Sequence, residues 1–294
     1  MARLGQGQQC CGAPAPAVAA PAAAGWDAAS AWYVRHMSPA TATLALSLHA
    51  HLGLLADFSS SDDGGGPRRP PLRVVETHCG DAQGASRLLP APAVASYTAC
   101  DFSPAMLARA QERLGDRAEV VNTDSASLPF ENESFDRYVS NLGCCCAPDL
   151  DGKLREAHRV LADGGVAAMS MRIANGEGDT AFAVIDEALK GFGLPPGPDR
   201  EGLRLGKDLP ALKAKFEGVG FKSPVAWRTW ITLPIHDEAS FQDFAIAQLP
   251  VQKFLAGLGD GEKAEAVQAL RAAGRKALDE GAIQIAVAAV VAKK

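Results

Sequence analysis

The stretch VVETHCGDAQG, residues 74–84, decides how this chain folds. It opens with a β-branched apolar run typical of a buried strand and ends in a turn that contains Gly80 and Gly84. A strand that leads through a glycine-bearing turn into a helix is the first unit of a doubly wound α/β sheet. Backbone amides in such a turn can approach a ligand closely, and the start of the next helix favours an anionic group.

Beyond this stretch, short apolar runs alternate with amphipathic ones. We expect Ser103 to cap a helix, Pro104 to take its first position and Gly115 to end it. A second helix is expected to close at the pair Gly164 and Gly165. The alternation predicts an α/β fold with a doubly wound, mostly parallel sheet, whose strand carboxyl ends meet at one edge. The expected strands are 72–78, 95–101, 118–124, 135–141, 166–172, 224–234 and 281–293.

Composition limits the class of protein. The chain has 294 residues, of which 47% are hydrophobic and 21% charged, which is globular and large enough for a sizeable core. A net charge of −5 argues against a broad nucleic-acid surface, and no apolar run approaches the roughly 18 residues of a membrane helix. Seven cysteines without a disulfide pattern favour a reduced, cytoplasmic setting. Organelle targeting by the Ala-rich start is the less favoured alternative.

Polar residues end four successive predicted strands: Glu76, Asp101, Asp124 and Asn141. An acid that ends the second strand can accept both hydroxyls of a ribose. An acid that ends the third can accept an adenine amino group, while the backbone amide of Ser125 or Ala126 reaches a ring nitrogen. Because the four positions follow in strand order, they predict a site for a nucleoside that carries an amino acid.

These residues resemble the class I S-adenosylmethionine-dependent methyltransferases, especially the type 11 small-molecule group that includes ubiquinone and menaquinone methylases. The other resembling stretches are ACDFSPAMLARA (99–110), DSASLPFENESFDRYVSN (124–141) and LREAHRVLADGG (154–165). The resemblance implies a Rossmann-like sheet of seven strands with the last one reversed. It also implies S-adenosylmethionine as the cofactor. The residues expected to hold it are Tyr33, Glu76, His78, Gly80, Asp101, Phe102, Met106, Asp124, Ser125 and Asn141.

The flanking regions complete the expected organisation. Residues 1–25, with three prolines and no acid, are expected to form a disordered tail, and 26–294 the methyltransferase domain. Within the domain, WDAASAWYVRHMSPAT (26–41) looks like the group's N-terminal lid, in which Tyr33 closes over the cofactor. The expected parts are a helical lid at 26–58, a flexible loop at 59–71, a cofactor-binding core at 72–172 and a substrate or cap region at 173–294.

Two positions depart from the group's pattern. His78 stands where glycine or alanine is usual, and Ala82 where glycine is usual, so a positive φ at Ala82 would cost about 1 kcal/mol. A dinucleotide-binding enzyme is disfavoured, because the turn does not read G-x-G-x-x-G and Asp124 would have no role there.

Cysteines and histidines supply the candidates for the acceptor side: His36, Cys144, Cys145 and Cys146. The three thiols could line a pocket for a soft metalloid, as in arsenite methylases, or could simply fill a turn. Neighbouring side chains of an extended chain point apart, so we expect no metal site. Asp136, and the pair Glu156 and Arg159, are interpreted as structural.

The leading hypothesis is therefore methyl transfer from S-adenosylmethionine to a small-molecule acceptor, with no nucleic-acid or membrane partner. No catalytic residue is assigned, since a base is needed only if the acceptor must lose a proton. The alternatives are a methyltransferase-like scaffold that has lost turnover, and thiol-assisted methylation of a metalloid. The sequence predicts neither the acceptor nor the oligomeric state.

Overall fold

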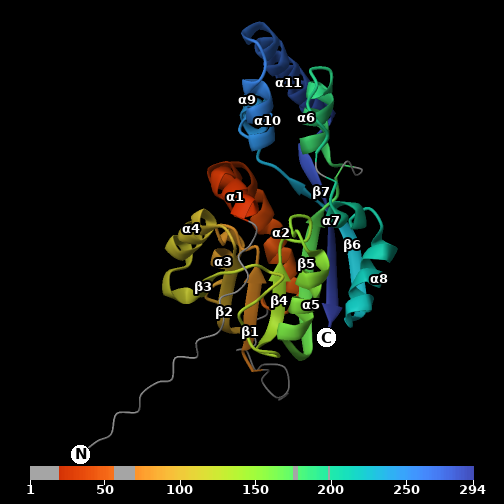
Figure 1. Cartoon of the computed structure of the whole chain (residues 1–294). Coiled ribbons are helices and arrows are strands. Elements are labelled where there is room, and N and C mark those ends of the chain that lie inside the picture. The colour runs from red at the N-terminus through yellow and green to blue at the C-terminus, as the bar shows by residue number, and fades with distance from the viewer. Residues whose placement is uncertain (1–19, 56–69, 175–177, 198) are drawn as a thin grey trace, which may run out of the picture.

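A twisted seven-stranded sheet runs through the computed structural model, which describes residues 20–55, 70–174, 178–197 and 199–294 (Figure 1). The strand order is β3-β2-β1-β4-β5-β7-β6, and β7 runs antiparallel to both of its neighbours. The predicted doubly wound, mostly parallel sheet with a reversed last strand is confirmed. The strands are β1 (Leu72–Thr77), β2 (Val94–Asp101), β3 (Glu119–Asn122), β4 (Phe135–Ser140), β5 (Leu161–Arg172), β6 (Lys222–Thr232) and β7 (Gln284–Lys293).

Helices cover both faces of this sheet. Val74 packs into a core with α2, α3 and α4, whereas Val75 packs into a second core with α5 and α8. This split follows from the alternation of side chains along a strand. The helices are α1 (Ala20–Trp32), the π-helix η1 (Tyr33–Met37), α2 (Ser38–His51), α3 (Gln83–Leu88), α4 (Pro104–Leu114), the 3₁₀ turn η2 (Gly115–Arg117), α5 (Leu150–Val160), α6 (Thr180–Lys190), α7 (Glu201–Leu205), α8 (Leu209–Val219), α9 (Glu238–Ile246), α10 (Leu249–Ala256) and α11 (Asp260–Glu280).

The helix boundaries agree with the sequence at α4 and differ at α5. The Ser103 hydroxyl accepts the Met106 N–H as the predicted cap, and Gly115 follows the last residue of α4. The predicted glycine stop of α5 is wrong, because α5 ends at Val160 and the next residue already pairs with β4. Gly164 and Gly165 lie inside β5, where the ladder register shifts, so they form a bulge.

The N-terminal boundary also needs correction. We expected disorder through residue 25, but α1 begins at Ala20. Pro21 lies in the first turn of α1, where backbone N–H groups have no acceptor within the helix, so a proline is compatible with the helix there. The remainder of the expected tail, 1–19, the last residues of the expected lid, 56–58, and most of the expected flexible loop, 59–69, lie outside the described residues.

A helical lobe formed by α6, α9, α10 and α11 extends beyond the carboxyl edge of the sheet (Figure 1). It packs on the N-terminal helices, where the Trp32 indole Nε1–H donates to the Phe244 carbonyl at 3.0 Å. The expected cap thus rests on the helices that cover the glycine turn. Among the described segments, none of the helices is both long and apolar enough to cross a bilayer.

Candidate functional site

The glycine-bearing turn between β1 and α3 has an unusual backbone. His78, Gly80 and Ala82 all adopt left-handed conformations, with φ of 58°, 56° and 54°. Ala82 therefore has the positive φ that is unfavourable for a residue with a Cβ. The strain of about 1 kcal/mol is borne by the surrounding structure, in which Ala82 is buried and packs in the core beneath the turn.

Asp101 joins this turn to the next one. Its Oδ2 accepts the Gly80 N–H at 3.0 Å and its Oδ1 accepts the Ser103 N–H at 3.0 Å. Burial raises the pKa of Asp101, and the backbone donors oppose that rise. A carboxylate has about four acceptor sites, so these bonds leave capacity for ligand hydroxyls. The carbonyl of Asp101 also accepts the Thr123 N–H, which holds the end of β3 alongside.

A small cavity lies beside the turn, and four of the predicted residues line it: Tyr33, Glu76, His78 and Asn141. Asp101 and Asp124 are not among its lining residues. Its volume is about 20 Å³, which holds roughly one water molecule. The cavity is this small because η1 and α2 pack directly over the turn.

Polar contacts fasten that cover. The Asn141 Nδ2 donates to the Thr41 carbonyl at 2.9 Å, and its Oδ1 accepts the Ser170 hydroxyl at 3.2 Å. The hydroxyl of Tyr33 lies 3.3 Å from the Thr41 Oγ1, and burial raises the pKa of Tyr33. Asn141 therefore connects α2 to the edge of the sheet, and the contact between Tyr33 and Thr41 joins η1 to α2.

Sequence reasoning missed another anchor of the same cover, Asp27 on α1. Its Oδ1 accepts the Ser103 hydroxyl at 2.6 Å and the Ala105 N–H at 3.0 Å, at the first turn of α4. A carboxylate is favoured there by the unpaired N–H groups of a helix start. The residue gave no sequence signal, because its partners lie more than seventy positions away.

Other predicted cofactor contacts are on neighbouring strand ends. Phe102 packs edge-on against the His78 ring at 6.1 Å between centroids, and Met106 is buried at the start of α4. Asp124 accepts the Ala126 N–H at 3.0 Å, and Ser125 is buried. The roles proposed for these residues toward a ligand remain predictions.

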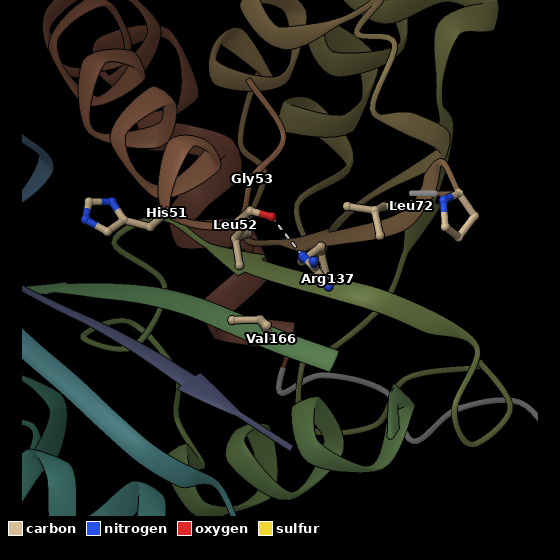
Figure 2. Close-up of a pocket in the computed structure, with 7 residues that line it drawn as sticks. His51, Leu52, Gly53, Leu72, Arg137 and Val166 are labelled. Atoms are coloured by element: carbon tan, nitrogen blue, oxygen red, sulfur yellow. Dashed lines mark hydrogen bonds between the residues drawn. The ribbon is translucent and has the colours of Figure 1, made fainter. Parts of the chain in front are cut away.

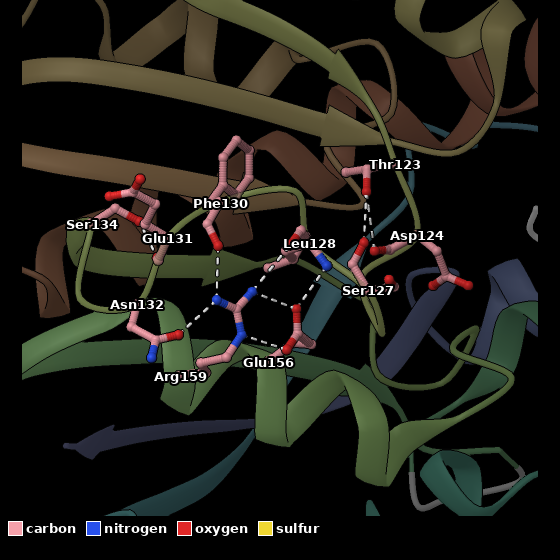
Figure 3. A network of polar contacts seen from close by, with 10 residues as sticks. All are labelled: Thr123, Asp124, Ser127, Leu128, Phe130, Glu131, Asn132, Ser134, Glu156 and Arg159. Carbon is pink, nitrogen blue, oxygen red and sulfur yellow. Dashed lines mark hydrogen bonds and ion pairs between the residues drawn. The ribbon is translucent and has the colours of Figure 1, made fainter. Parts of the chain in front are cut away.

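The loop that carries Asp124 is held by an ion pair on α5 (Figure 3). The Arg159 guanidinium donates to both Glu156 oxygens and to the carbonyls of Leu128 and Phe130, while Glu156 accepts the Leu128 N–H at 2.7 Å. The structural interpretation of this pair is confirmed, and so is that of Asp136, which is bound by Arg73.

The acceptor-side candidates separate from one another. His36 lies against Phe244 of α9, so it faces the lobe and does not line the cavity. Cys144 is buried with its Sγ 3.8 Å from the Met169 sulfur, whereas Cys145 and Cys146 have their sulfurs 3.8 Å apart.

A hydrogen bond from the Cys146 thiol lowers the pKa of Cys145. The Cys144 sulfur thus contacts Met169, while the sulfurs of Cys145 and Cys146 contact each other. Within the described parts of the chain, no three His, Cys, Asp or Glu side chains gather to hold a metal ion.

A larger cavity, of about 180 Å³, lies at the opposite edge of the sheet (Figure 2). There the Arg137 Nε donates to the Leu52 carbonyl at 2.8 Å, and His51 and Leu72 complete the wall. It is far from the strand carboxyl ends and contains none of the predicted site residues. The segment 56–69, outside the described residues, adjoins it in the sequence.

Glu76 predicts a pH dependence of stability. Burial raises its pKa to about 7 from 4.5, although the Tyr97 hydroxyl donates to it at 2.8 Å. Folding then takes up a proton at Glu76 between these pH values. The contribution of Glu76 to the free energy of unfolding is therefore fully present below pH 4.5 and is lost as the pH rises through 7. We expect Glu76→Gln to gain about 2 kcal/mol over wild type between pH 5 and pH 8, measured by urea unfolding.

Glu265→Gln, at an exposed position of α11, is the control for this measurement and should follow wild type at every pH. If the Glu76→Gln difference did not change with pH, Glu76 would not be the titrating group.

The strand order, the reversed β7 and the glycine turn joined to Asp101 are those of the Rossmann-like methyltransferase fold. Residues 75–169 match the family described as "Methyltransferase domain". The resemblance inferred from the sequence is confirmed for this part of the chain.

Curated relatives match segments of similar length. A phthiotriol/phenolphthiotriol dimycocerosates methyltransferase of Mycobacterium leprae is 39% identical over 115 residues, 38% of this chain and 43% of that protein. A ubiquinone/menaquinone biosynthesis C-methyltransferase of Agrobacterium fabrum is 34% identical over 106 residues, 34% of this chain and 41% of that protein. The matched segments thus span about two fifths of these relatives.

Solved structures support the fold alone. A [4+2]-cyclase, SpnF, superposes with a TM-score of 0.51 at 18% identity, covering 86% of this chain and 80% of its own. A putative methyltransferase from Bacillus halodurans gives a TM-score of 0.50 at 16% identity, covering 85% and 96%.

Proposed function

We propose that the chain binds S-adenosylmethionine at the carboxyl edge of the sheet and transfers its methyl group to a small-molecule acceptor. The observation that carries the proposal is Asp101, which bonds two consecutive turns and still has acceptor capacity at the position expected for ribose hydroxyls. The named functions of the matched relatives, on a lipid and on a quinone, agree with a small-molecule acceptor.

The residues at this edge fit such a cofactor in chemistry. Asp101 and Asp124 can accept from a nucleoside, and Glu76 can face a cationic amino group. A cavity of about 20 Å³ is too small for a nucleoside, so binding requires the helices fastened by Asp27 and Asn141 to shift. The thermodynamic cost of that shift reduces the observed affinity.

When bound, the sulfonium supplies an already activated methyl group. The protein's part is then to align the acceptor with the methyl carbon and to exclude water. The cover formed by η1 and α2 can exclude water, and the turn at Cys144, Cys145 and Cys146 follows β4 where an acceptor would approach. No side chain is assigned as a base.

Calorimetric titration of the whole chain with S-adenosylhomocysteine tests the proposal, together with mass spectrometry of the purified protein for retained nucleoside. We expect saturable binding, and no saturation with NAD. No heat and no thermal shift at about millimolar ligand, a concentration that detects even an affinity of about −4 kcal/mol, would overturn cofactor binding. Binding without transfer to any quinone or lipid phenol would favour the scaffold alternative.

A further inference from the structure

Lys153 is a buried cation that the proposed function has not used. It lies in the first turn of α5 with 0% of its surface exposed. Its Nζ donates to the Ser140 hydroxyl at 2.7 Å, the Thr77 hydroxyl at 3.1 Å and the His78 Nδ1 at 3.0 Å. All three acceptors are neutral, and no carboxylate of the described residues forms an ion pair with it.

The bond to His78 fixes the state of that ring. Burial lowers the pKa of Lys153 to about 8, so it is mostly an ammonium group at neutral pH. Since an ammonium group can only donate, the His78 Nδ1 must accept, and the ring proton must reside on Nε2. Burial and the charge of Lys153 keep the pKa of His78 well below its usual range. His78 is therefore a neutral donor with a cation behind it.

The cavity that His78 lines also contains two acids, Glu76 and Asp81. Asp81 is neutralised, because the Arg113 guanidinium donates to its Oδ2 at 2.7 Å. Glu76 has only the neutral Tyr97 hydroxyl as a donor, and no cation of the described residues pairs with it. The wall of the cavity thus combines a donor backed by an ammonium group with one acid, Glu76, that no cation of the described residues pairs with. A ligand group with both charges, an α-amino acid, complements this pair.

We propose that Lys153, acting through the Nε2–H of His78, positions the carboxylate of the amino-acid end of the cofactor, while Glu76 faces its ammonium group. The inference rests on the proposed function and concerns the same site. An acidic acceptor bound by His78 would leave Glu76 without a cation, so the cofactor's amino acid is the better match. Lys153 is a positioning residue here, because it touches His78 and not the ligand.

The test compares two ligands that differ in the amino acid: S-adenosylhomocysteine and 5′-methylthioadenosine. In calorimetry at pH 7, we expect Lys153→Met to lower the affinity for S-adenosylhomocysteine about tenfold, since it removes the charge behind one hydrogen bond. The affinity for 5′-methylthioadenosine should fall less than about twofold. Lys153→Gln should behave in the same way and serves if the methionine variant does not fold. Lys213→Met, at an exposed position of α8, is the control and should change neither affinity.

A double-mutant cycle with His78→Gly tests whether Lys153 acts through the His78 ring. Glycine is the chosen replacement because it accepts the φ of 58° at this position. In the His78→Gly protein, Lys153→Met should lower the affinity for S-adenosylhomocysteine by less than about a further twofold. Equal weakening of both ligands would show a merely structural role and overturn the inference. An unchanged affinity for S-adenosylhomocysteine, or a full loss on the glycine background, would overturn it too. Wild type that binds neither ligand would overturn the proposed function, and this inference with it.

Discussion

Replacing Asp101 by alanine should lower the affinity for S-adenosylhomocysteine about 100-fold, since two hydrogen bonds from ribose hydroxyls to a carboxylate are lost at about 1.5 kcal/mol each. The substitution also leaves the N–H groups of Gly80 and Ser103 without their acceptor. Because both donors belong to turns that shape the site, the loss of affinity combines a missing contact with a loosened backbone.

Asp101→Asn separates these two contributions. The amide keeps one acceptor oxygen and the shape of the side chain, so it should preserve more of the folding stability than of the affinity. Calorimetry gives the affinity and urea unfolding gives the stability of each variant. Asp116→Ala, at an exposed position after α4, should match wild type in both. An Asp101→Ala protein that binds within about threefold of wild type would contradict the proposed ribose site.

Gly84→Ala should destabilise the fold by about 3 kcal/mol, because α2 and α3 approach each other closely at this glycine. A Cβ built on Gly84 would lie 2.4 Å from the Cβ of Ala45. Neither atom is at the end of a flexible side chain, so the two helices must move apart. Since α2 also covers the cavity, the variant should bind S-adenosylhomocysteine with altered affinity as well.

Gly218→Ala is the matched control for this overlap. Gly218 lies inside α8, and a Cβ built on it meets nothing within 4 Å. Alanine there should stabilise the protein by about 0.5–1 kcal/mol through its helix propensity. Thermal unfolding of both variants measures the difference, with about 2–4 °C expected per kcal/mol. A Gly84→Ala variant as stable as wild type would mean that the helices are not in contact at this point.

Much of the fold could be predicted, because its signals are local. Apolar runs of strand length and the cap at Ser103 depend on neighbours within a few residues. The errors arose where distant partners decide. The glycine pair at 164 and 165 would end a helix in isolation, yet Leu161 and Val166 on either side of it pair with β4 and draw it into a strand.

The candidate site also has a part that the sequence predicts and a part that it does not. The sequence indicated which strand ends carry Glu76, Asp101 and Asn141, since topology alone sends them to one edge. It did not indicate Lys153, although a lysine between Leu150 and Leu154 on the apolar side of a helix is a signal that could have been read. A buried lysine becomes meaningful only when its neighbours are known.

The sequence by itself determined the doubly wound sheet, the glycine turn and the acids at the strand ends, because local spacing and the handedness of crossovers leave few other arrangements. Only the tertiary structure decided that the N-terminal helices close over the turn and that Asp27 and Asn141 fasten them. The same holds for the orientation of His78 by Lys153. These contacts join residues about 75 to 100 positions apart, and packing of the whole chain, not local preference, brings them together.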